Sequence, residues 1–250
     1  MTPVPASAAS ANRQFLLWTL ALLLLAGYGL HALWTRGLPW AAGAATRLVP
    51  AAWERELGES IAASIAPGAK PCLEDAAERL ARSLPAPSPY TFQVRCVPSA
   101  EINALAAPGG VILVYEGLLQ AAATREEIPA VLAHEMQHVL LRHSTRAIFR
   151  AFALQAVISL LAGDPTGLVA QVAGGLGVLH YMRADEEEAD REGVLLLKRA
   201  GFNPLAMSAL LESLDAATAG GAGVVPTWIS SHPDIRQRIA ATRALAHTLR

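Results

Sequence analysis

The longest uninterrupted apolar segment lies near the N-terminus. Residues 14–35 carry no formal charge, and leucine and alanine dominate the centre of the segment. A helix of about 20 apolar residues is long enough to span a bilayer. Trp18, Trp34 and Trp40 lie toward its ends, where amphipathic rings favour the membrane interface. The pattern predicts a transmembrane helix at 15–35.

This segment is longer than the apolar region of a cleaved signal peptide, which is about 7 to 15 residues. An uncleaved anchor therefore fits better, although the small residues at 41–45 keep cleavage as an alternative. Arg13 flanks one side and Arg36 and Arg47 flank the other. Because these charges nearly balance, they do not determine the orientation.

Helical periodicity follows over 51–65 and 71–84, with Pro71 placed to open the second helix and Pro85 to close it. Residues 90–97 alternate in polarity and are rich in β-favouring types. The patterns predict two covering helices and then a strand.

Pro108-Gly109-Gly110 separates two short apolar segments and is typical of a hairpin, because glycine adopts the positive φ of tight turns. We expect strands near 103–107 and 111–115. The resulting small antiparallel sheet has an edge that can hold an extended peptide through main-chain hydrogen bonds. An ordinary structural hairpin is the equal alternative.

Another apolar segment, 151–182, contains Asp164 as its one formal charge. Gly and Pro within 163–167 divide it into two predicted helices, each shorter than a membrane span. Buried core is the favoured interpretation of this hairpin. The alternative is a cover over the active site that touches the membrane surface.

Composition narrows the classes of function. The hydrophobic content of 53% excludes a disordered chain, and the balance of 20 basic and 21 acidic residues leaves no basic field for nucleic acid. The two cysteines, Cys72 and Cys96, form a disulfide or remain as two buried thiols, with equal weight for each.

The candidate chemistry is the sequence His134-Glu135-x-x-His138. Positions i and i+4 share one face of a helix, so both imidazoles can bind one metal ion, and this spacing is a zinc signature. Glu135 lies beside the metal, where it can accept a proton from an activated water. The alternative is a surface helix with two solvated histidines.

The bounds of this helix are predicted from its flanks. Thr124 and Glu127 form a possible capping box, and Pro129 moves the expected start toward Glu126. We expect the helix to reach about His143. On a continuous helix His143 lies roughly 140° from the face of His138, which predicts a structural role.

A catalytic zinc usually has three protein ligands. The acidic stretch 183–193 is the place to look for the third, although by charge alone such a stretch is usually a solvated helix face. Spacing does not choose among four candidates, which are Asp185, Glu186, Glu187 and Glu188.

Over about residues 50–245 the chain resembles the gluzincin family that contains the CAAX prenyl proteases, HtpX and the BepA-type periplasmic proteases. The similarity rests on a set of short motifs: His134-Glu135-x-x-His138, Glu186-x-x-Ala189-Asp190, Asn103-Ala104, Pro108-Gly109-Gly110, Arg142-His143, and Ser231-His232-Pro233 with Arg238. The combination is far more specific than any single piece.

The resemblance implies a site with one Zn²⁺ per chain. It makes Glu186 the third ligand beside His134 and His138, and Asp190 an acceptor for the N–H of a ligand imidazole. His232 would lie near the metal, where it assists the transition state or occupies the open position as a latch. Arg238 would orient that segment or Asp190. An ordinary helix-start turn is the equal alternative for Ser-His-Pro.

Three departures from the family pattern stand out. Met182 replaces a frequent serine, a tetratricopeptide extension is not seen, and only one clear membrane span is present. These features favour a single-pass protein of the bacterial inner membrane with its catalytic domain in the periplasm. There are two alternatives: the catalytic domain lies on the cytoplasmic face, or the protein is exported after cleavage of the N-terminal segment.

The expected fold is α+β: a mainly α-helical, zincin-like metallopeptidase domain with a small antiparallel sheet, preceded by one transmembrane helix. The expected organisation is a tail at 1–14, an anchor at 15–35, a linker at 36–50 and a zinc metallopeptidase domain at 51–250.

The resemblance implies an endopeptidase that acts on misfolded or envelope proteins. The expected partners are an unfolded or extended polypeptide and, through the N-terminal helix, membrane lipid, with no nucleic acid. The alternative function is a membrane-bound chaperone or assembly factor in which the zinc site is structural or latent.

Overall fold

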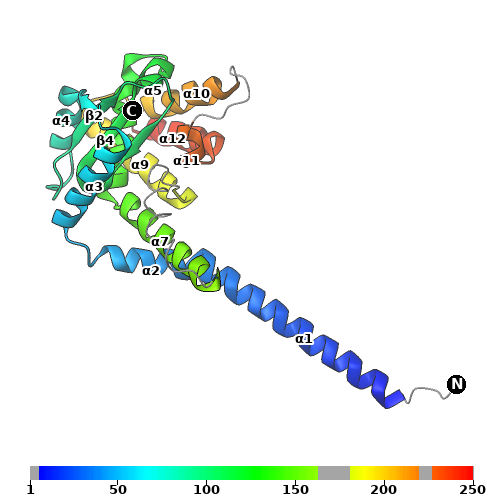
Figure 1. Cartoon of the computed structure of the whole chain (residues 1–250). Coiled ribbons are helices and arrows are strands. Elements are labelled where there is room, and N and C mark those ends of the chain that lie inside the picture. The colour runs from blue at the N-terminus through cyan, green and yellow to red at the C-terminus, as the bar shows by residue number, and fades with distance from the viewer. Residues whose placement is uncertain (1–5, 163–180, 220–226, 250) are drawn as a thin grey trace. The chain divides into compact units, whose positions relative to one another are not determined.

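The computed structural model describes residues 6–162, 181–219 and 227–249. The chain divides into two compact units, Met1–Ala45 and Thr46–Arg250 (Figure 1). Each unit is described separately below.

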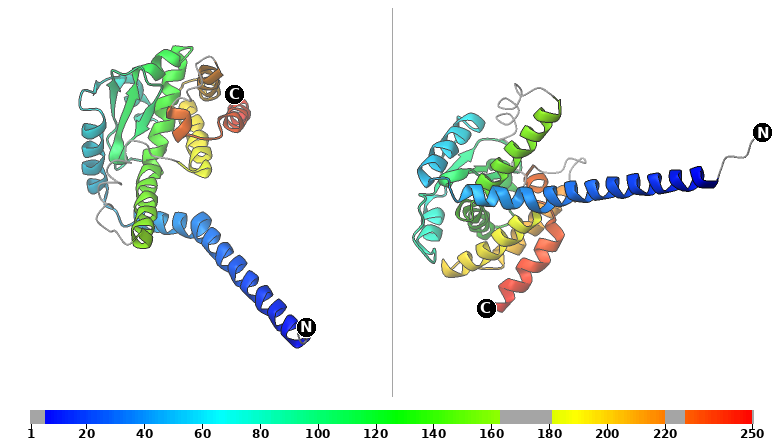
Figure 2. Two further views of the ribbon diagram at one scale, coloured as in Figure 1. Left: turned by 45° about the vertical axis from the view of Figure 1, so that its right-hand side comes forward. Right: turned by 90° about the horizontal axis from the view of Figure 1, so that it is seen from below.

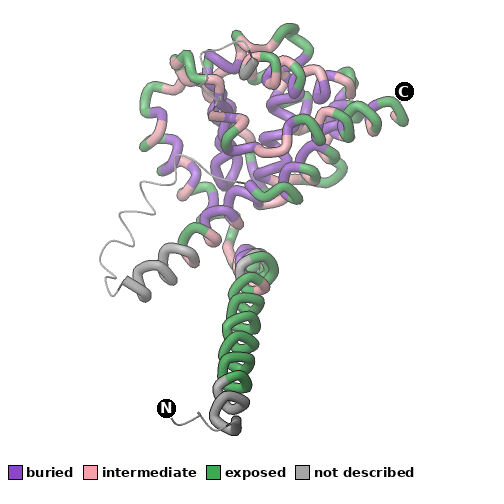
Figure 3. Tube along the Cα trace, turned by 90° about the vertical axis from the view of Figure 1, so that its right-hand side faces the viewer, coloured by how far each residue is buried: buried purple, intermediate pink, exposed green. Residues whose placement is uncertain are grey.

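The first unit is almost entirely helical. It contains α1 (Ala6–Ala32), a π-helical turn η1 (Leu33–Gly37) and nearly all of α2 (Leu38–Thr46). The residues of α1 from Arg13 to His31 are exposed (Figure 3), and Phe15 keeps 70% of its surface. Within the described residues, Arg13–Thr46 is the one stretch long and apolar enough to cross a membrane. The predicted N-terminal helix is confirmed.

The second unit contains a four-stranded sheet with the order β1-β2-β4-β3. Its strands are β1 (Lys70–Pro71), β2 (Gln93–Val97), β3 (Ala104–Ala106) and β4 (Val111–Tyr115). β3 and β4 are antiparallel and are joined by the turn η2 (Pro108–Gly110), in which Gly109 has φ 78° and Gly110 has φ 116°. The predicted hairpin and its two strands are confirmed.

The sheet is mixed, whereas a wholly antiparallel sheet was expected. β2 pairs in parallel with β4, with Val94 opposite Ile112. The reason is that residues 98–103 carry the chain past the position of β4 to the edge of the sheet, where β3 forms first. The hairpin then brings β4 back beside β2 in the same direction as β2.

Helices surround this sheet. Their bounds are α3 (Ala51–Ile65), α4 (Glu74–Arg82), α5 (Glu116–Ala121), the 3-10 turn η3 (Arg125–Glu127), α6 (Ile128–Leu140), α7 (His143–Ala162), α9 (Arg183–Arg199), α10 (Ala206–Ala219), α11 (Thr227–Ser231) and α12 (Ile235–Thr248). The bounds of α3 are those predicted.

The second predicted helix begins later than expected. Pro71 does not open it but pairs in β1 opposite Arg95, and α4 starts at Glu74 after Leu73, which has φ 55°. A disulfide joins Cys72 to Cys96 and holds this segment against β2. The extended pairing of Pro71 therefore replaces the predicted first turn, and α4 also ends at Arg82, before Pro85.

The helix that carries His134 lies between the sheet and α9 (Figure 2). Eleven of its residues are buried, including Leu132 and Met136, which are fully covered. Gly193 of α9 lets the two helices approach closely, because a Cβ there would lie 3.5 Å from the backbone nitrogen of His134 and 2.7 Å from the Met207 side chain. This packing brings the acidic face of α9 to the histidines of α6.

The capping box is confirmed, since the backbone N–H of Thr124 donates to Glu127 Oε1 at 3.1 Å. It caps η3, and α6 then starts at Ile128 with Pro129 in its first turn, where a missing N–H costs nothing. The end of α6 differs from the prediction. The helix stops at Leu140, Arg142 has φ 59°, and α7 begins at His143.

The predicted apolar hairpin over 151–182 is described only in part. Residues 151–162 belong to α7, a single helix that begins at His143. Residues 163–180, which contain the predicted turn and most of the second helix, lie outside the described residues.

Candidate metal centre

Four ligand atoms from three parts of the second unit converge on one buried point. They belong to His134 and His138 on α6, Glu186 on α9, and His232 just after α11, and all lie within 4.8 Å of one another. The Nε2 atoms of His134 and His138 are 3.0 Å apart. Each of the four side chains is at most 1% exposed. The i, i+4 spacing therefore brings the two imidazoles together as predicted.

Glu186 is the member of the acidic stretch that reaches the histidines. Its Oε1 lies 3.3 Å from Nε2 of His138, and its Oε2 lies 3.5 Å from Nε2 of His134. Asp185 points instead to Arg150, at 3.0 Å, and Glu188 lies beside His143. The structure thus distinguishes Glu186 from Asp185 and Glu188, which the spacing alone could not do.

His232 completes the cluster. Its Nδ1 is 3.0 Å from both carboxylate oxygens of Glu186 and 3.3 Å from Nε2 of His134. Burial lowers the pKa of His232 to about 4, despite the opposing effect of Glu186. The imidazole is therefore neutral near pH 7, with either a proton or a lone pair on Nδ1.

The donor set fits a zinc ion. Bonds of about 2.0 to 2.1 Å in a tetrahedral site separate neighbouring ligand atoms by about 3.3 Å, close to the separations of 3.0 to 3.5 Å among His134, His138 and Glu186. Nδ1 of His134 lies 2.9 Å from Oδ1 of Asp190, which favours a proton on Nδ1. Burial lowers the pKa of His134, but Asp190 and Glu186 outweigh burial and raise it to about 9. Nε2 therefore presents a lone pair when a bound cation displaces its proton. Buried nitrogen lone pairs beside a carboxylate form a cation site.

A buried ion pair supports this arrangement. Arg238 donates from Nε to Oδ2 of Asp190 at 2.6 Å, and its Nη1 lies 2.6 Å from Oε2 of Glu186. Burial raises the pKa of Asp190, but the charges and hydrogen bonds of Arg238 and His134 together outweigh burial and lower that pKa to about 2. Arg238 also donates to the backbone carbonyl of His232 at 3.3 Å. Arg238 therefore contacts both the segment of His232 and Asp190, which the family resemblance gave as alternative partners.

Glu135 lies beside the four donors and outside their cluster. Its Oε1 accepts a hydrogen bond from Nε1 of Trp228 at 3.3 Å and lies 3.8 Å from Nε2 of His232. Its Oε2 is buried without a hydrogen-bond partner among the described residues. One oxygen of this carboxylate is thus held in place while the other is free to accept a proton.

Two aromatic residues at the site were not predicted. Trp228 stacks on His232 with ring centroids 4.4 Å apart, and Tyr181 stacks on His138 at 3.9 Å. Trp228 also contacts Glu135, and Tyr181 contacts His138, and both of these contacts join residues far apart in the sequence. The sequence signal available for Trp228 was its position four residues before His232.

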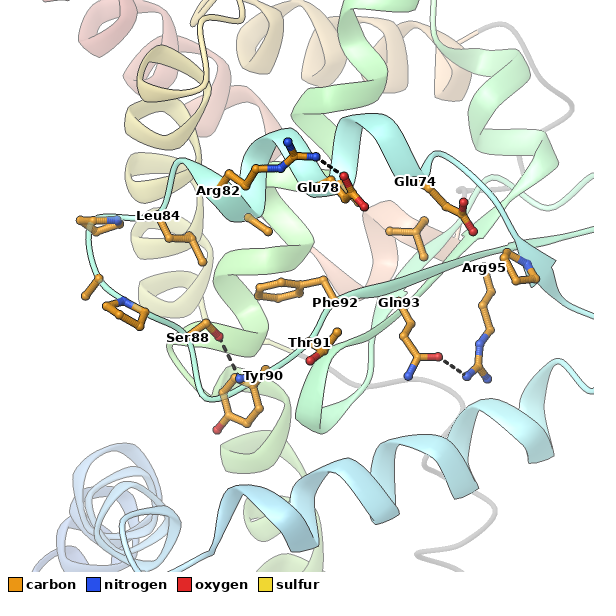
Figure 4. Close-up of a pocket in the computed structure, with 17 residues that line it drawn as sticks. Glu74, Glu78, Arg82, Leu84, Ser88, Tyr90, Thr91, Phe92, Gln93 and Arg95 are labelled. Atoms are coloured by element: carbon orange, nitrogen blue, oxygen red, sulfur yellow. Dashed lines mark hydrogen bonds and ion pairs between the residues drawn. The ribbon is translucent and has the colours of Figure 1, made fainter.

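A separate cleft lies between α4, the loop 84–92 and β2 (Figure 4). It has a volume of about 760 Å³ and is bordered by Phe92, Leu84 and several charged side chains, including Glu74 and Arg95. None of the four candidate ligands lines it. The candidate metal site therefore lies outside this cleft, at the contact between α6 and α9.

A helix-borne pair of histidines, a carboxylate from a second helix and an adjacent buried glutamate define the class of metal-dependent peptidases. The model of peptidase family M48 matches residues 67–246, so the chain belongs to this family.

Similar proteins come from bacteria and from mitochondria. The chain is 36% identical over 140 residues to the mitochondrial metalloendopeptidase OMA1 of Schizosaccharomyces pombe, a match that covers 55% of this chain and 41% of that protein. It is 30% identical over 173 residues to the beta-barrel assembly-enhancing protease of Escherichia coli, covering 64% and 35%. The chain thus spans about a third to two fifths of the length of these relatives.

Proposed function

We propose that this protein is a membrane-anchored, zinc-dependent endopeptidase that cleaves misfolded or envelope proteins. The observation that carries the proposal is the buried cluster of His134, His138 and Glu186 beside the unpartnered Oε2 of Glu135. Membership of peptidase family M48 supports the reaction class. The identity of the metal as zinc rests on the nitrogen-rich donor set and its spacing.

His134, His138 and Glu186 would hold the ion. When bound, a zinc ion polarises the scissile carbonyl and makes a water molecule more acidic. Glu135 then acts as general base: its Oε2 accepts the proton of the attacking water and passes it to the leaving amine. Trp228 keeps Glu135 in position through the hydrogen bond to Oε1.

Asp190 and Arg238 position the ligands. Asp190 holds the imidazole of His134 through Nδ1, so that Nε2 presents its lone pair to the metal. Arg238 in turn fixes both Asp190 and Glu186. We assign these two residues the same roles that the family resemblance implied.

An extended polypeptide is the proposed substrate. β3 is the edge strand of the sheet and packs against α6, the helix that carries the two histidines. A peptide added to this edge would gain main-chain hydrogen bonds without any need for a particular sequence. That mode of binding suits unfolded chains of varied composition.

The proposed location is the periplasmic face of a bacterial inner membrane. The long exposed apolar helix supports a single-pass anchor at 15–35, and the disulfide between Cys72 and Cys96 supports an oxidising compartment. The names of the bacterial relatives, which refer to β-barrel assembly, point to the same envelope.

A second candidate function follows from the position of His232. If its Nδ1 carries a lone pair, the metal has four protein ligands, which is the coordination of a structural or latent site. If Nδ1 carries a proton, it donates to Glu186 at 3.0 Å and leaves a coordination position open. The first state favours a chaperone or a protease held inactive, and the second favours a constitutive enzyme.

The test of the proposed function is Glu135→Gln, purified as the full chain with its metal and assayed on unfolded casein. General acid and base catalysis contributes about 10²- to 10⁴-fold, so activity should fall by that factor while zinc content stays unchanged. Glu187→Gln, on an exposed position of α9, is the matched control. Full activity in Glu135→Gln would exclude the general-base role.

Two further variants separate the remaining assignments. Glu186→Ala should lower the zinc content, and unchanged stoichiometry and affinity would place the third ligand elsewhere. His232→Ala should raise activity if this residue is a latch and lower it if it assists the reaction. An inactive wild type that stays inactive as His232→Ala, with zinc retained, would favour the chaperone.

A further inference from the structure

His143 lies behind the proposed metal ligand His138. It is fully buried, and its Nδ1 is 3.1 Å from Nδ1 of His138, on the side of that ring away from the metal cluster. Its other nitrogen, Nε2, is 3.3 Å from Oε2 of Glu188. His143 therefore bridges a carboxylate on α9 and an imidazole on α6.

The backbone of Arg142 explains how His143 reaches this position. Were α6 continuous, His143 would lie far around the helix from His138. The left-handed conformation of Arg142 ends α6 and starts α7 in a new direction. The side chain of Arg142 donates a hydrogen bond to Glu54 at 2.9 Å and another to the carbonyl of Val49 at 2.6 Å.

Glu188, His143 and His138 are in contact one after the other. The position of the proton on each imidazole follows from what Glu188 can accept. Glu188 is a carboxylate, which only accepts hydrogen bonds, so Nε2–H of His143 must be the donor in the contact between them. A neutral His143 with its proton on Nε2 has a lone pair on Nδ1. That lone pair can accept only from Nδ1–H of His138, because two lone pairs 3.1 Å apart would repel. Nε2 of His138 then carries the lone pair that a metal requires.

We infer that His143 is a positioning residue for His138 and that Glu188, His143 and His138 form a relay that selects the metal-binding tautomer of His138. The inference rests on the proposed metal site. It also means that the two ligand imidazoles are oriented differently. Asp190 contacts His134 directly, whereas Glu188 acts on His138 through a second imidazole.

The surroundings of the relay are consistent with this assignment. His143 has 0% side-chain exposure and Glu188 has 39%, so the relay runs from the surface to the metal cluster. Arg146 lies 3.9 Å from Glu188 and 3.1 Å from Asp185. Asp185 is farther from Nε2 of His143, at 3.9 Å, and has its own partners. Glu188 is thus the nearest acceptor for His143.

The test compares two substitutions of His143 in the full-length, detergent-solubilised protein. His143→Leu removes the acceptor and keeps a similar volume. His143→Asn keeps an oxygen acceptor near the place of Nδ1. The readout is the affinity for Zn²⁺, measured by competition with a chelator. Loss of a residue that orients a ligand typically costs 10- to 100-fold in metal affinity, so we expect that loss for His143→Leu and affinity close to wild type for His143→Asn.

A second pair of variants avoids any change in the core. Glu188→Ala should weaken Zn²⁺ binding, and Glu187→Ala, its exposed neighbour on the same helix, should not. The unfolding temperature of each metal-free variant separates the relay from a merely structural role, which would lower that temperature without selectively changing Zn²⁺ affinity.

Any one of three results would overturn the relay. The first is unchanged Zn²⁺ affinity in His143→Leu, and the second is equal affinity in Glu188→Ala and Glu187→Ala. The third is equal weakening in His143→Asn and His143→Leu, which would exclude a role for the Nδ1 acceptor. A wild-type protein that binds no Zn²⁺ would instead overturn the proposed metal site itself, so the two failures are distinguishable.

Discussion

Helices α1 and α6 are both built mainly from apolar residues, yet their environments are opposite. α1 has 27 residues, and its large apolar side chains are exposed, Leu23 at 65%. α6 has 13 residues, of which 11 are buried, and Leu132 is fully covered. At 1.5 Å per residue α1 is about 40 Å long, more than a bilayer core of about 30 Å, whereas α6 is about 20 Å long.

The difference shows that apolar content does not identify the surroundings of a helix. The length of a helix is one indication of its surroundings, and the polar residues that it carries are another. α6 carries His134, Glu135 and His138 in its buried surface, and each has a polar group from another element within reach. A helix can bury such groups only when the rest of the fold supplies their partners. Changes to those partners, and to the two helices themselves, test this comparison.

The largest effect is expected when Arg238, the cation that holds the two α9 carboxylates facing α6, is removed. Arg238→Met would leave Asp190 and Glu186 as buried carboxylates without their cation, which typically costs about 3 to 5 kcal/mol. Arg236→Met is the control, because that side chain on the same helix is 89% exposed. Denaturant unfolding of the purified protein measures both. Equal stability of the two variants would contradict the support assigned to Arg238.

The same substitution in each helix should give different results. Leu132→Ala opens a cavity in the core beside the sheet and should lower the free energy of unfolding of the second unit by about 2 to 5 kcal/mol. Leu23→Ala in α1 should change it by no more than about 0.5 kcal/mol. Denaturant unfolding in detergent is the measurement. A comparable loss in both variants would mean that α1 is part of the same folded core.

A charge in the middle of α1 should weaken its proposed membrane insertion. Arginine near the centre of a membrane helix costs about 2.5 to 3.5 kcal/mol on insertion scales, so Leu23→Arg should shift protein from the membrane fraction to the soluble fraction. Leu48→Arg, at a site that is 85% exposed and beyond the candidate span, is the control. Retention of Leu23→Arg in alkali-washed membranes would argue against the anchor.

The smallest effect concerns the start of α6. Thr124→Ala removes the capping interaction of η3 and should cost about 1 kcal/mol of stability. Thr124→Ser keeps a hydroxyl in the same place and should retain most of that stability. Thermal unfolding distinguishes the two. Identical unfolding temperatures would show that the capping interaction of Thr124 contributes no stability.

Local features of the fold were predictable from the sequence. α3 has the predicted bounds, the Pro-Gly-Gly turn joins the two predicted strands, and Thr124 forms its capping box. The spacing of His134 and His138 brings their rings together. Each of these depends on residues a few positions apart, where periodicity and turn chemistry act directly.

Features that depend on distant residues were not predictable. The parallel pairing of β2 with β4 and the strand pairing of Pro71 follow from how the chain crosses the sheet. Spacing could not select Glu186, because only the approach of α9 to α6 determines which carboxylate faces the histidines. Trp228 reaches Glu135 through the same kind of long-range packing.

Arg142 also has a consequence for engineering and for natural variation. A left-handed residue other than glycine carries a conformational penalty of about 1 to 2 kcal/mol, and Arg142 has φ 59°. A search for stability at this position alone would choose glycine. That choice would relieve the backbone and at the same time delete the hydrogen bonds to Glu54 and Val49. A substitution at residue 142 therefore has two opposing effects. It changes the conformational penalty of the left-handed backbone, and it changes the hydrogen bonds that fix the direction of α7.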